Sequence, residues 1–345
     1  MNEEPETTVE ENVSTLFEDD LSPSRKTVPV KQQLMILALL LLVIFGSGLV
    51  TTVLALLGDD SDTDQMANTS TATETVTAPE ALQRGGANDD VTITATAAFV
   101  WDVNTQRILY AKNPDERLPL ASLTKLMTAL VAHEIVASNS TITIPESAID
   151  QDGESGLSSG ETFNAEDLSD LTLISSSNDG AFALANAAGA VLSSSAPTET
   201  FVQAMNIRAD ELGLSQTYYR NPTGLDLSET EAGAYGSARD TAFLVEYILK
   251  HAPTILEVTN KTDAQLASES GVVHQVRNTN QTVDDIVGIL GSKTGYTTLA
   301  GGNLAIAFDA SLNRPVIVVV LGSTYNGRFS DVVHLSEYAR NVISQ

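Results

Sequence analysis

A serine and a lysine three residues apart form the first pair in this chain that could do chemistry, Ser122 and Lys125. Apolar residues recur at helical spacing from 122 to 136, and residues three apart share one face of a helix. Burial lowers the proton affinity of a lysine amine, and a neutral amine can take the proton of a neighbouring hydroxyl. The pair is therefore a candidate activated nucleophile. The alternative is a serine that caps a helix beside a lysine whose charge reaches solvent.

A second polar motif, Ser176-Ser-Asn178, falls between two segments with helical periodicity. Short polar side chains are common at such junctions because they cap helices, so this motif is weak by itself. The same pattern recurs at Ser311-Leu-Asn313, between two predicted strands. We interpret that second match as a hairpin turn.

A third motif, Lys293-Thr294-Gly295, lies in a strand-like segment. There Lys293 can supply positive charge, Thr294 a hydroxyl for a carboxylate, and Gly295 room for a substrate backbone. Ser-x-x-Lys is expected about once by chance in a chain of this length. The evidence for a catalytic site therefore comes from the order and the setting of all three motifs.

The elements that must position these motifs follow one another as strands, then helices, then strands. A hairpin is predicted from 97 to 110, with its turn at Asn104-Thr105. Beyond the helix at 122 to 136, helical periodicity covers 166 to 176, 178 to 192, 198 to 213 and 237 to 251, and it returns at 329 to 343. Strand-like runs cover 272 to 278, 289 to 296, 302 to 308 and 315 to 321. This order predicts an α+β fold around an antiparallel sheet.

The N-terminal part differs in composition from the rest. Residues 1–33 are polar and acidic, residues 34–57 are uncharged and apolar, and residues 58–90 are rich in Thr, Ser, Ala and Asp. Twenty-odd apolar residues match the roughly 30 Å hydrocarbon core of a bilayer. We expect a cytoplasmic disordered tail, one transmembrane helix, a flexible extracytoplasmic linker and a catalytic domain at 91–345. Basic residues before the span and aspartates after it place the N-terminus in the cytoplasm.

The formal net charge of -27 argues against nucleic acid or anionic lipid as a partner of the globular part. No cysteine is present, which excludes disulfides and thiolate chemistry. His133, His251, His274 and His334 show no metal-ligand spacing, so we expect them at the surface or at helix ends. No metal or cofactor is expected.

The three motifs occur together in penicillin-binding proteins and β-lactamases. From about 96 to 342 the chain resembles the D-alanyl-D-alanine carboxypeptidase family of low-molecular-mass penicillin-binding proteins (serine peptidase family S11). Further similar segments are Ala121-Ser-Leu-Thr-Lys-Leu-Met-Thr-Ala-Leu130, Ser177-Asn-Asp-Gly-Ala181, Asn221-Pro-Thr-Gly-Leu225, Ala238-Arg-Asp240 and Gly291-Ser-Lys-Thr-Gly-Tyr-Thr297. The resemblance implies a β-lactamase/DD-peptidase-like fold with a mostly helical subdomain, a peptidoglycan stem peptide ending in D-Ala-D-Ala as substrate, and β-lactam antibiotics as covalent inhibitors.

The resemblance also implies a role for each motif residue. Ser122 would attack the carbonyl between the terminal D-alanines, Lys125 would act as general base, and Ser176 would pass a proton to the departing D-alanine. The oxyanion would be held by the backbone amides of Ser122 and Tyr296. Asn178 would orient both the substrate and Lys125. Lys293 would hold the Ser176 hydroxyl and lower the pKa of the lysine base. Thr294 and Arg328 would bind the terminal carboxylate, and Gly295 is the remaining expected substrate-binding residue. For Arg328 the alternative is a solvated surface arginine.

The chain departs from the family pattern at two positions, with Ser177 and Gln106 where the family often has glycine. We expect Ser177 to narrow the cleft.

Three rival functions remain open. A class A β-lactamase needs a carboxylate for the deacylating water, for which Glu199, Glu211 and Glu229 are poor candidates. The others are a DD-endopeptidase and an inactive wall-binding module.

Overall fold

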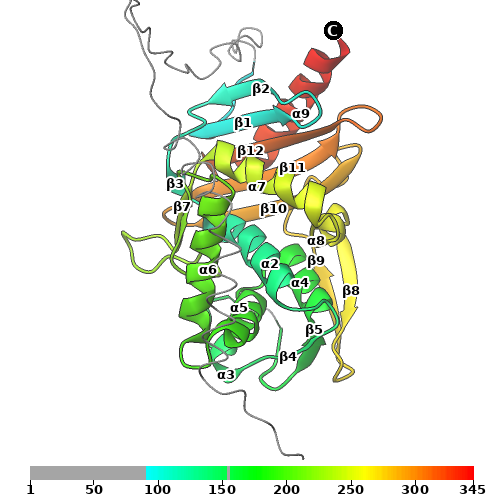
Figure 1. Ribbon diagram of the computed structural model, residues 1–345. Helices are drawn as coiled ribbons and strands as arrows, with labels where there is room; N and C mark the ends of the chain where they lie inside the picture. Colours follow the sequence, from blue (N-terminus) through cyan, green and yellow to red (C-terminus); the bar gives the residue numbers. More distant parts are fainter. Residues whose placement is uncertain (1–90, 154–155) are drawn as a thin grey trace, which may run out of the picture. The chain divides into compact units, whose positions relative to one another are not determined.

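The computed structural model describes residues 91–153 and 156–345. Its centre is a five-stranded antiparallel sheet in the order β10-β11-β12-β1-β2 (Figure 1). The strands are β1 (Ala97–Asp102), β2 (Arg107–Lys112), β10 (Ile289–Thr297), β11 (Gly301–Asp309) and β12 (Pro315–Ser323). The N-terminal hairpin thus pairs with the last strand, and the expected α+β fold with an antiparallel sheet is confirmed.

Side chains of the central strands alternate between two apolar layers because successive residues of a strand point to opposite faces. Phe99 and Val319 belong to the larger core, together with residues of helix α7 (Ala238–His251). Val100 and Val318 belong to the second core, together with residues of helix α9 (Gly327–Ser344). The sheet is therefore covered by α7 on one face and by α9 on the other (Figure 1).

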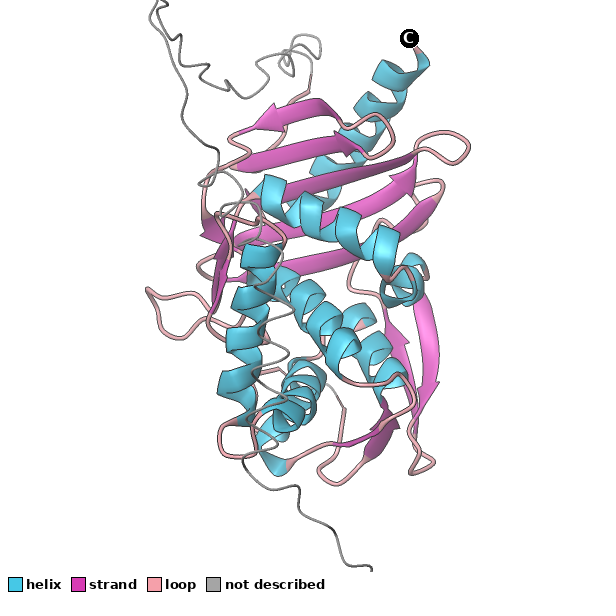
Figure 2. Ribbon diagram, in the orientation of Figure 1, coloured by secondary structure: helices cyan, strands magenta, loops and turns pink. Residues whose placement is uncertain are grey.

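The remaining helices lie together on one side of the sheet (Figure 2). They are η3 (Ala121–Leu123), α2 (Thr124–Ile135), α3 (Glu146–Ile149), α4 (Ala165–Ile174), α5 (Asn178–Leu192), α6 (Pro197–Glu211), α8 (Thr254–Glu257) and η4 (Val258–Asn260). Helix α2 lies at their centre, with every residue from Thr124 to Ala132 buried. The long predicted helices are confirmed within a few residues at each end.

The short strands were not expected from the sequence. They are β3 (Leu118–Pro119), β4 (Thr141–Thr143), β5 (Thr162–Asn164), β6 (Tyr218–Tyr219) and β7 (Ala234–Gly236). β8 (Asp263–Ala267), which pairs with β9 (Val273–Arg277), was missed as well. Strands of two or three residues carry no period-two pattern, and β8 has only one buried side chain, so hydrophobic patterning cannot reveal them.

The predicted hairpin turn at Ser311-Leu-Asn313 is confirmed: it lies between β11 and β12, and Asn313 has a φ of 51°. Gln106 closes the first hairpin with a φ of 51°, which accounts for the glycine that the family often has there.

The predicted tail at 1–33, transmembrane helix at 34–57 and linker at 58–90 all lie outside the described residues. Within 91–153 and 156–345, no helix has the length and apolar character needed to cross a membrane.

Candidate active site

Ser122 lies in η3, directly before helix α2, beside the edge strand β10. Its neighbour Ala121 has a φ of 48°, a left-handed conformation that costs energy for a residue with a side chain. Two contacts hold this segment: the Asn303 side chain donates to the carbonyl of Leu120 (3.1 Å), and Gly224 packs against the carbonyl of Ala121. The strained turn is thus fixed from two sides.

The Lys125 amine has three oxygen neighbours. Its Nζ lies 3.0 Å from Ser122 Oγ, 2.7 Å from Asn178 Oδ1 and 2.7 Å from the carbonyl of Thr223. The amide and carbonyl oxygens can only accept hydrogen bonds. A neutral amine donates two hydrogen bonds and accepts one, so its lone pair is left for the hydroxyl proton of Ser122.

Ser176 and Lys293 form the second polar pair of the site. Lys293 Nζ donates to Ser176 Oγ (2.8 Å) and to the carbonyl of Thr294 (2.9 Å). Ser176 has a φ of 63°, so its backbone is in the left-handed region between α4 and α5. Backbone strain of this kind concentrates at functional sites.

Asn178 bridges Lys125 on α2 and the loop that follows α3. Its Oδ1 accepts from Lys125, and its Nδ2 donates to the carbonyl of Asp152 (2.5 Å). The expectation that Ser177 narrows the cleft is wrong. Ser177 is 4% exposed, and its Oγ accepts from the amide of Gly180 (2.9 Å), because it caps helix α5.

Burial controls the charge of both lysines, since desolvation disfavours the ammonium form. It lowers the pKa of Lys125 from 10.5 to about 7. Burial also lowers the pKa of Lys293 well below its ordinary value, and repulsion from the Lys125 and Arg328 charges adds to this effect. Near neutral pH, a substantial fraction of Lys125 is therefore a neutral amine.

Strand β10 forms the wall of the site opposite Ser176. Thr294 Oγ1 lies 2.6 Å from Thr279 Oγ1. A Cβ on Gly295 would lie 2.8 Å from the carbonyl of Leu120 and 3.2 Å from the amide nitrogen of Ser122. Gly295 is therefore required for the close approach of β10 to the Ser122 turn, a reason that the sequence did not reveal.

Arg328 is 4% exposed, so the alternative of a solvated surface arginine is wrong. It lies in the first turn of helix α9, and its Nη1 donates to the carbonyl of Gly295 (2.7 Å). The guanidinium lies over the ring of Tyr325, 4.6 Å from its centroid, and Tyr325 forms an edge-to-face pair with Tyr296. Its Nε is buried without a hydrogen-bond partner in the described structure. The cation therefore retains donor capacity for an anion.

A cleft of about 600 Å³ opens in front of Ser122 and Ser176. Ser122, Ser176, Thr294, Tyr296 and Arg328 line it, and it continues along the segment from Arg277 to Asp284. The carbonyl of Thr223 and the hydroxyl of Thr279 complete the site. Neither was singled out from the sequence, although Thr223 belongs to the Asn221-Pro-Thr-Gly-Leu225 segment noted there.

Asp284 is the carboxylate among the described residues that line this cleft, and Glu199, Glu211 and Glu229 do not line it. The expectation that all histidines occupy surface or helix-end positions is wrong for His274. Its side chain is 9% exposed and lies 2.6 Å from Glu161. Within the described ranges, no three acidic or histidine side chains form a potential metal site.

Comparisons with known proteins agree with this geometry. A family profile described as D-alanyl-D-alanine carboxypeptidase matches residues 83–324. The chain is 32% identical over 265 residues to the D-alanyl-D-alanine carboxypeptidase DacF of Bacillus subtilis, covering 75% of this chain and 65% of that protein. It thus spans slightly less than two thirds of the length of that relative.

A D-alanyl-D-alanine endopeptidase of Pseudomonas aeruginosa is 32% identical over 251 residues, covering 71% of this chain and 74% of that protein. Among solved structures, the Streptomyces K15 DD-transpeptidase superposes with a TM-score of 0.66 at 25% identity, covering 74% of this chain and 99% of that one.

Proposed function

Because the chain belongs to the D-alanyl-D-alanine carboxypeptidase family of serine peptidases (peptidase S11), we propose that it removes the terminal D-alanine from peptidoglycan stem peptides through an acyl-enzyme on Ser122. The observation that carries this proposal is the contact of the Lys125 amine with Ser122, Asn178 and Thr223. Two fixed acceptors direct the remaining lone pair at the nucleophile.

In the proposed first step, Ser122 Oγ attacks the carbonyl between the two terminal D-alanines, and its proton passes to Lys125. The backbone amides of Ser122 and Tyr296 hold the oxyanion. Such preorganised donors contribute about 3 to 4 kcal/mol each to transition-state stabilisation. Ser176, hydrogen-bonded to Lys293, relays the proton that Lys125 has taken to the departing amine, the C–N bond breaks, and free D-alanine leaves. Water then hydrolyses the ester and restores the Ser122 hydroxyl.

The terminal carboxylate of the substrate is proposed to bind Thr294 and Arg328. Both line the cleft that contains Ser122, and the buried guanidinium retains donor capacity. A carboxylate and a guanidinium form strong, charge-assisted hydrogen bonds.

The test is covalent labelling of the full chain by a fluorescent penicillin, with assay of D-alanine released from a diacetyl-L-Lys-D-Ala-D-Ala peptide. We expect both activities in the wild type and neither in Ser122→Ala. Ser175→Ala is the matched control, since that hydroxyl donates to a helix carbonyl, and it keeps both activities. Absence of labelling in the folded wild type would refute the proposal.

The extension of the cleft towards Arg277 and Asp284 favours a second candidate, a DD-endopeptidase, since it offers room for a leaving group larger than D-alanine. Cleavage of a cross-linked muropeptide dimer tests this function. Release of D-alanine from monomers without cleavage of dimers would exclude it.

We further propose that residues 34–57 span the cell membrane as a helix, with the N-terminus in the cytoplasm and the catalytic domain outside. The apolar composition of that segment and the charges on its two sides support this topology. The chain has no cysteine, so single substitutions can be labelled without background. On intact cells, a membrane-impermeant maleimide should modify Ser70→Cys and leave Ser14→Cys unmodified; the reverse pattern, or labelling of both, contradicts the proposal.

A further inference from the structure

A second cavity, separate from the catalytic cleft, lies between helices α2, α4 and α8. Its volume is about 230 Å³, and it shares no lining residue with the cleft that contains Ser122. Ala129, Ala132, Leu184 and Ile255 form an apolar wall. The proposed catalytic reaction makes no use of this space.

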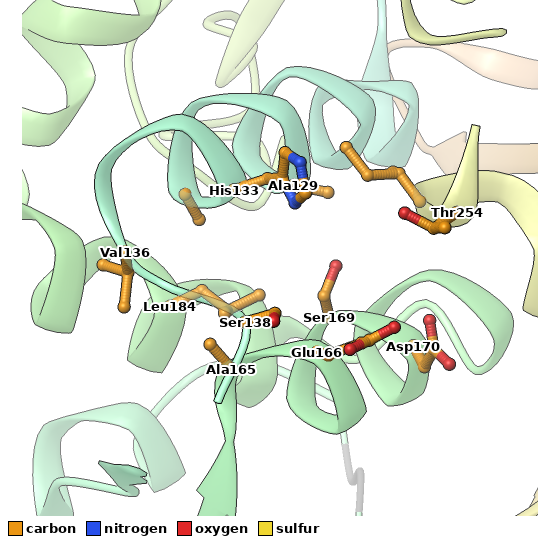
Figure 3. Close-up of a pocket in the computed structure, with 12 residues that line it drawn as sticks. Ala129, His133, Val136, Ser138, Ala165, Glu166, Ser169, Asp170, Leu184 and Thr254 are labelled. Carbon is orange, nitrogen blue, oxygen red and sulfur yellow. The ribbon is translucent and has the colours of Figure 1, made fainter. Parts of the chain in front are cut away.

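The opposite wall is polar and acidic. Figure 3 shows Glu166, Ser169 and Asp170 on α4 facing the cavity, with His133 across from them on α2. Asp170 forms no hydrogen bond or ion pair within the described part of the chain, and only part of its surface reaches solvent. The cavity thus combines an apolar body with two carboxylates, of which Asp170 is the more buried.

The surroundings of Asp170 disfavour its negative charge. Burial, followed by repulsion from Glu166, Asp167 and Glu257, raises the pKa of Asp170 to about 7, and attraction to Lys261 offsets part of this shift. A cation placed in the cavity would reverse the balance, because an opposite charge within about 4 to 6 Å favours the ionised carboxylate.

The size of the cavity limits the ligand. A closed apolar cavity of about 150 Å³ accommodates benzene, whereas drug-sized ligands occupy roughly 300 to 1,000 Å³. The volume of about 230 Å³ therefore suits a single ring or a short alkyl chain with one polar group.

We propose that this cavity binds a small organic cation, with its ammonium group beside Asp170 and Glu166 and its apolar body against Ala129, Ala132 and Leu184. The charge of the wall selects an amine over a neutral or anionic molecule of the same shape. His133 remains compatible with such a ligand in its neutral form and opposes it when protonated.

Calorimetric titration of the full chain with benzylamine, and with benzyl alcohol as its neutral counterpart, tests this site. At pH 8 we expect one benzylamine bound about tenfold more tightly than benzyl alcohol. Asp170→Asn should abolish the difference, whereas Glu116→Gln, which removes an exposed carboxylate that does not line the cavity, should preserve it. Equal affinities, or a difference that survives in Asp170→Asn, overturn the proposal.

The cavity itself is tested by Ala132→Leu, whose added bulk should prevent binding of both probes. Penicillin labelling of Ser122 serves as the folding control. Far-UV circular dichroism provides a second folding control that does not depend on catalytic activity. Binding that is unchanged in folded Ala132→Leu would place the amine elsewhere and overturn the assignment.

The pH dependence separates Asp170 from its neighbours. With a pKa of about 7, Asp170 is about one-tenth ionised at pH 6 and nine-tenths ionised at pH 8, so benzylamine affinity should rise about tenfold between them. The rise should vanish in Asp170→Asn. If it persists there, His133 or Glu166 carries the effect, and Asp170 is not the ammonium partner.

Discussion

At the scale of single residues, the site depends on two lysines that are both buried, Lys125 and Lys293. Removing an ammonium group from water is costly, and two such groups also repel each other. Burial therefore lowers the pKa of both amines, so that the neutral form becomes accessible, and the neutral form of Lys125 can accept a proton. Burial therefore produces the base that the proposed reaction needs.

The rate of acylation by penicillin should consequently rise with pH through about 7 and then level off. Below that value Lys125 carries a proton and cannot accept another, and above it the amine is free. Because Lys125 and Lys293 interact, the observed midpoint belongs to the pair. Stopped-flow labelling between pH 5.5 and 8.5 measures the profile, with circular dichroism at each pH to exclude unfolding. A flat profile, or a rate that falls with pH, would contradict a lysine base.

The side chains of the site could be predicted from the sequence, because the three motifs are defined by residue types at fixed spacing. Ser122, Lys125 and Asn178 form one hydrogen-bonded group, and Ser176 and Lys293 form a second. The carbonyl of Thr223 was not predictable, since every residue has a carbonyl and only the fold selects one. The role of Ser177 was misjudged for a related reason: helix capping depends on a backbone conformation that one sequence leaves undetermined.

At the scale of elements, the nucleophile turn is held by its packing against the loop that contains Gly224. Gly224 has a φ of 81°, and a Cβ there would overlap the carbonyl of Ala121. Gly213 has a φ of 71° with open space around it, so an alanine there would bear only the cost of the left-handed backbone conformation.

Gly213→Ala should therefore lower the free energy of unfolding by roughly 1 to 2 kcal/mol and leave acylation unchanged. Gly224→Ala should lower it further and slow acylation of Ser122 at least about tenfold, because a small displacement of a catalytic group has a large kinetic effect. Urea unfolding and penicillin labelling measure the two quantities. Equal effects of the two variants would show that the contact with Ala121 has no role.

A second element-scale contact joins the start of the described chain to α9. Asp331 is 2% exposed and accepts from the amides of Thr94 and Ala95 and from the hydroxyls of Thr94 and Ser323. Asp331→Ala leaves the buried amide of Ala95 and the part-buried amide of Thr94 without an acceptor, and a buried unsatisfied donor costs about 1 to 3 kcal/mol.

We expect Asp331→Ala to lower the free energy of unfolding by about 3 kcal/mol or more in urea titrations. Glu337→Ala, on an exposed position of the same helix, should change it by less than about 0.5 kcal/mol. A comparable effect of both variants would indicate loss of helix charge rather than loss of the contact.

Hydrophobic periodicity predicted the long helices and the five sheet strands, because each buries a continuous apolar face. It did not predict β3 to β8, whose few residues are held by tertiary contacts rather than by a pattern of their own. Nor could it predict that β12 pairs with β1, a contact between opposite ends of the domain sequence. Local pattern thus defines elements, and long-range packing defines their neighbours.

At the scale of the whole molecule, the dominant property is a formal net charge of -27, from 45 acidic and 18 basic residues. Charge of one sign repels itself in the compact state and is relieved by unfolding. Ion pairs such as Arg208 with Glu211 and Arg239 with Asp115 act in the opposite direction. Salt weakens both effects, so the response of stability to salt shows which one dominates.

Exposed ion pairs contribute only about 0 to 1 kcal/mol each, so we expect repulsion to dominate. The urea midpoint of the full chain should therefore rise between 0.01 and 0.5 M salt, by the same amount in NaCl and KCl, with an unchanged denaturant slope. A difference between the two salts would indicate specific cation binding instead of screening. A midpoint that falls with salt would mean that the ion pairs outweigh the net charge, and that the acidic surface costs this protein little stability.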